Sequence, residues 1–215
     1  MRKIVLDTET TGLDPRQGHR IIELAAIELD GRQVSLRRFH RYLNPEREIE
    51  AGAVAVHGLT YERLQNEAKF ADIAASFLEF IEDAELIIHN APFDMGFLNH
   101  ELSLIGLPAL QNEVMDTLKM AREMHPGKKN SLDALCGRYE IDNAHRSLHG
   151  ALLDTELLAE VYFAMTRGQE SLLGDDMPMT RKPAVLSTDA ARPKLRVLQP
   201  SAEELAEIRE VLESS

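Results

Sequence analysis

Two acidic side chains, Asp7 and Glu9, follow a short apolar run near the start of the chain. Residues 4–6 are predicted to form a buried strand, in which alternate side chains share a face and lie about 7 Å apart along the backbone. Two carboxylates on one rigid strand suit a hard cation such as Mg²⁺ or Mn²⁺, which binds oxygen ligands and keeps water molecules for a phosphate substrate. An isolated Asp-x-Glu pair is also compatible with a solvated strand end, so the interpretation depends on the rest of the chain.

Three further candidate groups lie much later in the sequence. Asp94 falls in the first turn of a predicted helix, where the positive end of the helix dipole stabilises a carboxylate, although a simple capping role would explain it equally well. His149 and Asp154 are five residues apart, and on a single helix they would diverge by about 140°. If both serve one site, His149 must precede the helix, beside the permissive Gly150, while Asp154 lies inside it.

The elements that must position these groups begin with strands. Residues 21–29 are predicted to form a second strand, and Asp30-Gly31 between two apolar stretches is typical of a hairpin turn, which needs residues that tolerate positive φ. The third strand ends at Asn44-Pro45. The chain therefore opens with a three-stranded antiparallel meander.

Beyond Thr60, a predicted helix N-cap, strands alternate with helices. This pattern is typical of the α/β class, with a mixed five-stranded sheet flanked by helices. The remaining predicted strands cover residues 86–88 and 114–115, and the predicted helices begin at residue 61 or cover residues 70–81, 93–105, 116–124, 131–139 and 152–162.

The composition limits the possible classes of protein. The 215 residues are 44% hydrophobic, which suits one domain of about 150 to 170 residues plus an appended segment. There is neither an 18-residue apolar run nor a signal-peptide pattern, so we expect a cytoplasmic protein without membrane contact. The only cysteine, Cys136, is predicted to lie in a helix core. A net charge of −12 disfavours broad electrostatic binding to nucleic acid, so a nucleic-acid substrate would be held locally.

The sequence divides into a folded domain at residues 1–167, a linker at residues 168–200 and a terminal helix at residues 201–215. The linker lacks hydrophobic periodicity and is predicted to be flexible. The terminal helix begins with the capping-box pattern Ser201-Ala-Glu-Glu. Because so short a helix is marginal in isolation, we expect it to bind a partner. Its apolar face consists of Leu205, Ile208 and Leu212.

Together, the acidic motifs resemble those of the DEDDh 3′→5′ exonucleases, the DnaQ-like superfamily with a ribonuclease H-like fold. Asp-x-Glu at residues 7–9, His-Asn-x-x-Phe-Asp at 89–94 and His-x₄-Asp at 149–154 occur in that family's order within residues 2–167. The segment Val-His-Gly-Leu-Thr at 56–60 also resembles the family's segment beside the substrate. Within the superfamily, the chain looks most like the proofreading exonucleases of bacterial replicative polymerases.

The resemblance implies a two-metal mechanism, in which Mg²⁺ or Mn²⁺ ions about 3.5 to 4 Å apart assist phosphodiester hydrolysis. Asp7, Glu9 and Asp154 would hold one ion. Asp7 would also touch the second, on which Asp94 would act through water. His149 would be the general base. The candidate contacts to the terminal nucleotide are Thr8, Thr10, His57 and Phe93.

The expected activity is release of 5′-mononucleotides from single-stranded or frayed DNA 3′ ends by the proofreading subunit of a replicative polymerase. A ribonuclease of the same superfamily that trims RNA 3′ ends is one alternative, and a non-catalytic assembly module is another. The complete motif set disfavours the assembly module. The tail disfavours a freestanding ribonuclease, since a trimming enzyme needs no tether.

The tail also suggests partners. By the resemblance, residues 201–215 would bind the catalytic, alpha-type subunit of the polymerase, with their apolar face in a groove. Gln169, Leu172 and Leu173 resemble a Gln-x-x-Leu-type peptide that binds the sliding clamp, which makes the clamp a second candidate partner.

Overall fold

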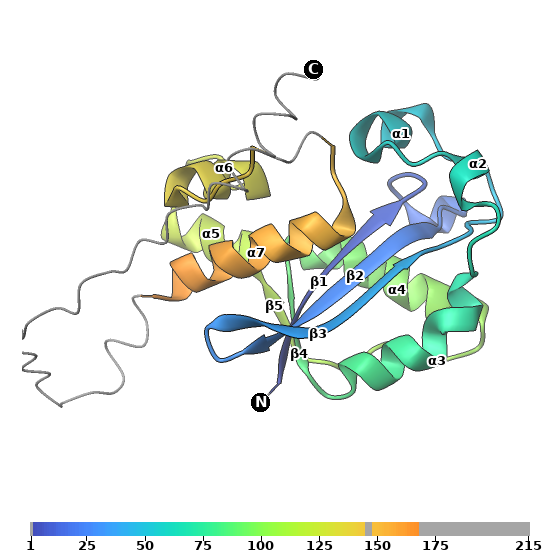
Figure 1. Ribbon diagram of the computed structural model, residues 1–215, viewed down its shortest axis with the longest axis horizontal. Coiled ribbons are helices and arrows are strands. Elements are labelled where there is room, and N and C mark those ends of the chain that lie inside the picture. Colours follow the sequence, from blue (N-terminus) through green and yellow to red (C-terminus); the bar gives the residue numbers. More distant parts are fainter. Residues whose placement is uncertain (1, 145–147, 168–215) are drawn as a thin grey trace, which may run out of the picture. The chain divides into compact units, whose positions relative to one another are not determined.

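The computed structural model describes residues 2–144 and 148–167, and Figure 1 shows how their helices and strands are arranged. The linker predicted over residues 168–200 and the helix predicted over residues 201–215 lie outside the described residues. The same holds for the candidate partner-binding side chains Gln169, Leu172, Leu173, Leu205, Ile208 and Leu212. None of the described helices combines the length and the apolar character needed to cross a membrane.

The centre of the domain is a five-stranded mixed sheet with the strand order β3-β2-β1-β4-β5. Its strands are β1 (Lys3–Thr10), β2 (Ile21–Asp30), β3 (Gln33–Tyr42), β4 (Glu85–Ile88) and β5 (Val114–Asp116). β2 pairs antiparallel with both β1 and β3, whereas β4 runs parallel to both β1 and β5. The predicted meander and the mixed five-stranded sheet are therefore confirmed.

Helices cover both faces of this sheet (Figure 1). The described helices are α1 (Ala51–His57), α2 (Tyr61–Leu64), α3 (Phe70–Ile81), α4 (Ala91–Leu104), α5 (Thr117–Met124), α6 (Leu132–Tyr139) and α7 (Ala151–Thr166), with a short 3-10 helix at Pro15–Gln17. Of these, α3 and α4 contribute to the core on one face of the sheet, and α5, α6 and α7 to the core on the other. Thr60 occupies the N-cap position of α2 as predicted, but its side chain makes no capping hydrogen bond. The α2 helix therefore begins without a side-chain cap.

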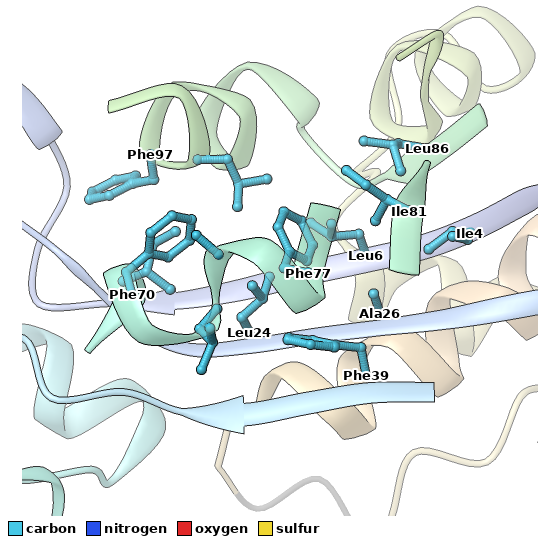
Figure 2. Packing of buried hydrophobic residues seen from close by; sticks show 14 of the residues in the cluster. Ile4, Leu6, Leu24, Ala26, Phe39, Phe70, Phe77, Ile81, Leu86 and Phe97 are labelled. Atoms are coloured by element: carbon cyan, nitrogen blue, oxygen red, sulfur yellow. The ribbon is translucent and has the colours of Figure 1, made fainter. Parts of the chain in front are cut away.

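Alternate residues of β1 pack on opposite faces of the sheet. Ile4 and Leu6 point toward α3 and α4, where they lie in one apolar cluster with Phe77 (Figure 2). Val5 belongs to a second cluster with side chains of α5, α6 and α7, including the buried Cys136. Continuing the alternation places odd-numbered residues at the end of β1 on the α7 face and even-numbered ones on the α4 face.

Candidate functional site

The end of β1 and the beginning of α7 bring three of the predicted acidic side chains together. Asp7 and Glu9 follow Val5 on the face of the sheet that α7 covers. Asp154 lies in the first turn of α7 and is 4% exposed, and Glu9 is 8% exposed. A register shift between Glu9 and Thr10 interrupts the pairing of β1 with β2 at this point, and such irregularities are frequent beside active sites.

His149 completes this group from the segment that precedes α7. Gly150 is the N-cap of α7, with extended backbone, so His149 lies outside the helix while Asp154 lies within it. The His149 Nδ1 atom is 3.4 Å from Asp154 Oδ2. Glu9, His149 and Asp154 each offer one ligand atom, and these atoms lie within 4.8 Å of one another. Two carboxylates and an imidazole at such distances fit a divalent cation.

The segment that carries His149 is held by the end of α1. The backbone N–H of His149 donates to the carbonyl of Val56 at 3.0 Å. Gly58 ends α1 with φ at 73°, and a Cβ at this position would lie 2.7 Å from Leu148 Cδ1. Residues 56–58 therefore fix the backbone beside the histidine, although they are far from it in the sequence.

Asp94 approaches β1 from the other face of the sheet. It is buried in the first turn of α4, which begins after Asn90, a residue with φ at 69° that tolerates the left-handed region better than most. Asp94 Oδ1 accepts hydrogen bonds from the backbone N–H of Thr8 at 3.1 Å and from its hydroxyl at 2.7 Å. The α4 helix is thus attached to the residue between Asp7 and Glu9.

Burial and mutual repulsion disfavour the ionised forms of these carboxyl groups. Burial raises the pKa of Asp7 well above its ordinary value, and the neighbouring charges of Asp94, Glu9, Asp154 and Glu23 raise it further. Burial also raises the pKa of Asp94 to about 7, against the hydrogen bonds from Thr8, which lower it. A bound cation would relieve both effects, so the donor set fits a metal site.

A pocket of about 380 Å³ adjoins Glu9. This volume lies within the usual range for small-molecule sites. All four predicted nucleotide contacts, Thr8, Thr10, His57 and Phe93, line it. Its wall also contains Val56, from the predicted substrate segment 56–60, and residues that were not predicted to line it, namely Gly12, Leu13, Glu50, Gly52 and Ala53.

The hydrogen bonds of Thr10 and His57 show how each of these predicted nucleotide contacts is held in the pocket wall. The Thr10 hydroxyl donates to the carbonyl of Gly12 at 2.7 Å, so it shapes the loop. His57 is 5% exposed, and burial lowers its pKa. Its Nδ1 accepts from the N–H of Leu59 at 3.0 Å, so the proton of the neutral ring lies on Nε2. That Nε2 atom is buried near the backbone of Thr10, a contact that raises the pKa of His57 against the effect of burial.

His19 supports the pocket from behind and was not identified from the sequence. It is 3% exposed, with Nδ1 3.0 Å from the hydroxyl of Thr11 and Nε2 3.2 Å from Glu50 Oε1. Its ring lies so close to Gly12 that a Cβ there would be 2.3 Å from His19 Cε1. In the sequence, Gly12, three residues after Glu9, is consistent with this close approach.

Glu23 is a further buried carboxylate that the sequence analysis missed. It is 3% exposed and lies opposite Glu9 in the pairing of β1 with β2. Its Oε1 is 2.7 Å from Nε2 of His40 on β3. The signal in the sequence is an acidic residue within the apolar strand 21–29. A carboxylate buried in such a strand needs a polar partner, so its presence indicates a specific contact.

Comparison with known proteins agrees with this geometry. A model of the RNase_T family, described as exonuclease, matches residues 4–162. The DNA polymerase III subunit epsilon of Rickettsia felis is 50% identical over 225 residues, covering 100% of this chain and 96% of the relative. The subunit of the same name from Escherichia coli K12 is 46% identical over 217 residues, covering 95% of this chain and 89% of the relative.

Solved structures with a similar fold are more distant in sequence. Exonuclease X in complex with 5′ overhanging duplex DNA superposes with a TM-score of 0.62 at 24% identity, covering 76% of this chain and 90% of the other. E. coli Exonuclease I in complex with a dA16 oligonucleotide gives 0.69 at 19% identity, covering 80% of this chain and 42% of the other. These likenesses support the fold.

Proposed function

Because the chain belongs to the exonuclease family and, within it, to the DNA polymerase III epsilon subunits, we propose that it removes 5′-mononucleotides from DNA 3′ ends as the proofreading subunit of polymerase III. The family assignment made from the three acidic motifs is confirmed. A role in bacterial replication would place the protein in the cytoplasm. The observation that carries the proposed chemistry is the convergence of Glu9, His149 and Asp154 beside a nucleotide-sized pocket.

The acidic side chains would hold two divalent cations, Mg²⁺ or Mn²⁺. When bound, such ions lower the pKa of a water molecule and stabilise the leaving oxygen of an in-line displacement at phosphorus. Asp7, Glu9 and Asp154 are the proposed ligands of one ion, and Asp7 would also contact the second. Asp94, fixed by Thr8, would act on the second ion through water.

His149 is the proposed general base. Its side chain is 44% exposed, so a water molecule can reach it, and Asp154 Oδ2 lies 3.4 Å from Nδ1, where a carboxylate can orient the ring. His57 would contact the terminal nucleotide, because its side chain lines the pocket beside Glu9. Phe93 offers an aromatic ring at the pocket wall, on which a base or sugar can pack.

The test compares matched DNA, mismatched DNA and RNA 3′ ends as substrates of the full chain with Mg²⁺. We expect faster release of mononucleotides from mismatched DNA, because a frayed end enters the pocket without the cost of unpairing. A variant carrying Asp7→Ala and Glu9→Ala and a sample in excess EDTA are the negative controls. Preference for RNA would favour the alternative ribonuclease, and full activity of the double variant would exclude this site.

The proposed partners are contacted through the tail. The match to the Rickettsia felis epsilon subunit extends over 100% of this chain and so includes residues 168–215. Leu205, Ile208 and Leu212 would bind the alpha-type catalytic subunit of the polymerase, and the peptide that begins at Gln169 would bind the sliding clamp. Between them, a linker of about 20 residues would have a root-mean-square span of roughly 25 Å, which keeps the exonuclease near the primer end.

Truncation at Gly168 tests this tether. It should leave hydrolysis of short oligonucleotides intact and abolish co-purification with the polymerase subunit. Replacing Gln169, Leu172 and Leu173 by alanine should weaken clamp binding alone. Undiminished polymerase binding by the truncated protein would exclude the tail as the contact.

A further inference from the structure

Four exposed cations lie on α5 and in the loop that follows it, and we call them the α5 basic track. They are Lys119, Arg122, Lys128 and Lys129. Residues 117–139 contain five basic and two acidic side chains, whereas the whole chain has 24 basic and 36 acidic ones. The track is therefore a local excess of positive charge on an acidic protein.

The track gathers four cations that have no carboxylate partner among the described residues. Several other cations of the described part pair with carboxylates, for example Arg2 with Glu28 at 2.8 Å and Arg20 with Glu101 at 2.7 Å. No ion pair joins any of the four track residues to an acid within residues 2–144 and 148–167. These charges remain available to an anionic ligand.

The loop after α5 is braced from within, so it presents its two lysines on a fixed backbone. The buried side chain of Asn130 donates to the carbonyl oxygens of His125 at 3.3 Å and Lys128 at 3.1 Å. Arg138 donates to Asn130 Oδ1 at 3.0 Å and to the carbonyl of Lys129 at 2.8 Å. Less conformational entropy is lost on binding when the backbone is already held in this way.

The track begins beside the candidate site. Asp116 Oδ1 caps α5 by accepting from the N–H of Leu118 at 2.9 Å, and it also accepts from the N–H of Asn90 at 3.3 Å. Asn90 is the N-cap of α4, the helix that carries Asp94. From this point the eight residues of α5 extend about 12 Å before the lysine loop.

We propose that the α5 basic track binds the phosphates of the substrate strand upstream of the nucleotide being removed. This inference rests on the proposed function. The pocket beside Glu9 has room for the terminal nucleotide, so the remaining strand must leave it across the surface of a chain with net charge −12. A track about 12 Å long spans roughly three nucleotides of a stacked strand. Contacts to phosphates hold any sequence, as a proofreading enzyme requires.

A protein partner fits this surface less well. Met124 is the only large hydrophobic side chain within residues 117–139 that is exposed. Lysine is depleted in protein interfaces, whose cores are apolar and aromatic. The charges and the scarcity of apolar area therefore favour a single-stranded nucleic acid as the ligand.

The test uses the full chain carrying Lys128→Ala and Lys129→Ala, two exposed changes that leave the bracing carbonyl groups in place. The control carries Arg37→Ala and Arg38→Ala, which also remove two adjacent, exposed charges, but from β3, where Glu28 at 3.0 Å and Glu156 at 3.2 Å already compensate them. Each protein is assayed with Mg²⁺ on a 15-nucleotide single strand and on thymidine 5′-(p-nitrophenyl phosphate), which has no upstream phosphate.

We expect the lysine variant to raise KM for the 15-nucleotide strand by about 3- to 10-fold, with an unchanged rate on the nitrophenyl ester. The dependence of log(kcat/KM) on log salt concentration should become less steep by about 1.4, or about 0.7 for each lost phosphate contact. The arginine control should match the wild type in both measurements. Lys128→Glu with Lys129→Glu should have a larger effect in the same direction.

Three results would overturn the proposed track. One is an unchanged KM and salt dependence in the lysine variant, and another is an equal change in the arginine control. The third is an unchanged KM together with lost co-purification with the polymerase catalytic subunit, which would make the surface a protein interface. Inactivity of the wild type on both substrates would instead overturn the proposed function itself.

Discussion

A single carboxylate oxygen of Asp94 accepts two hydrogen bonds from Thr8, one from the backbone N–H at 3.1 Å and one from the hydroxyl at 2.7 Å. These bonds join the first turn of α4 to the middle of the Asp-x-Glu motif. They favour the ionised carboxylate and so oppose burial, which raises the pKa of Asp94 to about 7. Thr8 thereby keeps a buried carboxyl group in a form that can act on a cation near neutral pH.

Thr8→Val should raise the pKa of Asp94 further, because it removes the hydroxyl and retains the backbone N–H. We expect the acidic limb of the kcat/KM profile to move upward by about one pH unit, the usual effect of one hydrogen bond to a charged group. Thr8→Ser should restore the wild-type profile. The measurement is the pH dependence of nitrophenyl ester hydrolysis with Mg²⁺. A uniform loss at every pH would instead assign Thr8 to substrate contact alone.

The metal-free protein should lose stability as the pH rises through the range in which the buried carboxyl groups ionise. Asp7 and Asp94 have folded-state pKa values above those of the unfolded chain, so the folded state binds more protons between the unfolded and folded values, a range that for Asp94 is about pH 4 to pH 7. Their stabilising effect is complete below about pH 4 and is lost as the pH passes the folded pKa.

Asp94→Asn removes one of these groups, so it should raise the melting temperature in EDTA at about pH 8 and change it little at about pH 4. Thermal denaturation followed by circular dichroism measures the difference, and Asp83→Asn, at an exposed position, is the control. A destabilised Asp94→Asn protein at the higher pH would show that the carboxylate is structurally required.

Divalent cations should stabilise the folded chain. Mg²⁺ or Mn²⁺ would neutralise carboxylates that repel one another, and a ligand that binds only the native state raises the melting temperature as its concentration rises. Asp154→Asn should abolish hydrolysis and reduce this increase while leaving the metal-free protein at least as stable as the wild type. Unfolding of the metal-free variant would indicate that Asp154 is structural.

His149→Ala distinguishes a general base from a metal ligand. As a base, His149 contributes about 10² to 10⁴ to the rate, so the variant should be slow at every metal concentration yet retain the metal-induced rise in melting temperature. Its Nδ1 lies 3.4 Å from Asp154 Oδ2, in the group of possible ligands with Glu9, so a ligand role is chemically feasible. A metal titration with its midpoint shifted to higher concentration would support that second role.

The position of the acidic side chains on β1 was predictable, because the alternation of side chains along a strand depends only on residues that are neighbours in the sequence. The pattern of residues 4–9 placed Asp7 and Glu9 on one face, and the spacing of His149 and Asp154 required the loop before α7 that the structure contains. What the sequence did not reveal arises from packing between distant segments. His19 lies against Gly12, and Glu23 gains importance from its place opposite Glu9 in the β1 and β2 pairing.

Gly12→Ala should damage the pocket through His19. The added Cβ would lie 2.3 to 2.6 Å from three atoms of the His19 ring, which is buried and held by its contacts with Thr11 and Glu50. The pocket loop must therefore shift. We expect a loss of about 1 to 3 kcal/mol in the free energy of unfolding and a clear rise in KM for single-stranded DNA.

Two further variants make this effect specific to the contact. Gly96→Ala is the control, because a Cβ there meets nothing within 4 Å and alanine favours the helix. Adding His19→Ala to Gly12→Ala removes the clashing ring, so the double variant should reverse part of the rise in KM, whereas His19→Ala alone should weaken the loop. Residues in direct contact should show coupling in a double-mutant cycle. If the effects of the two substitutions on the unfolding free energy and on log KM are strictly additive, the contact between Gly12 and the His19 ring does not determine the shape of the pocket.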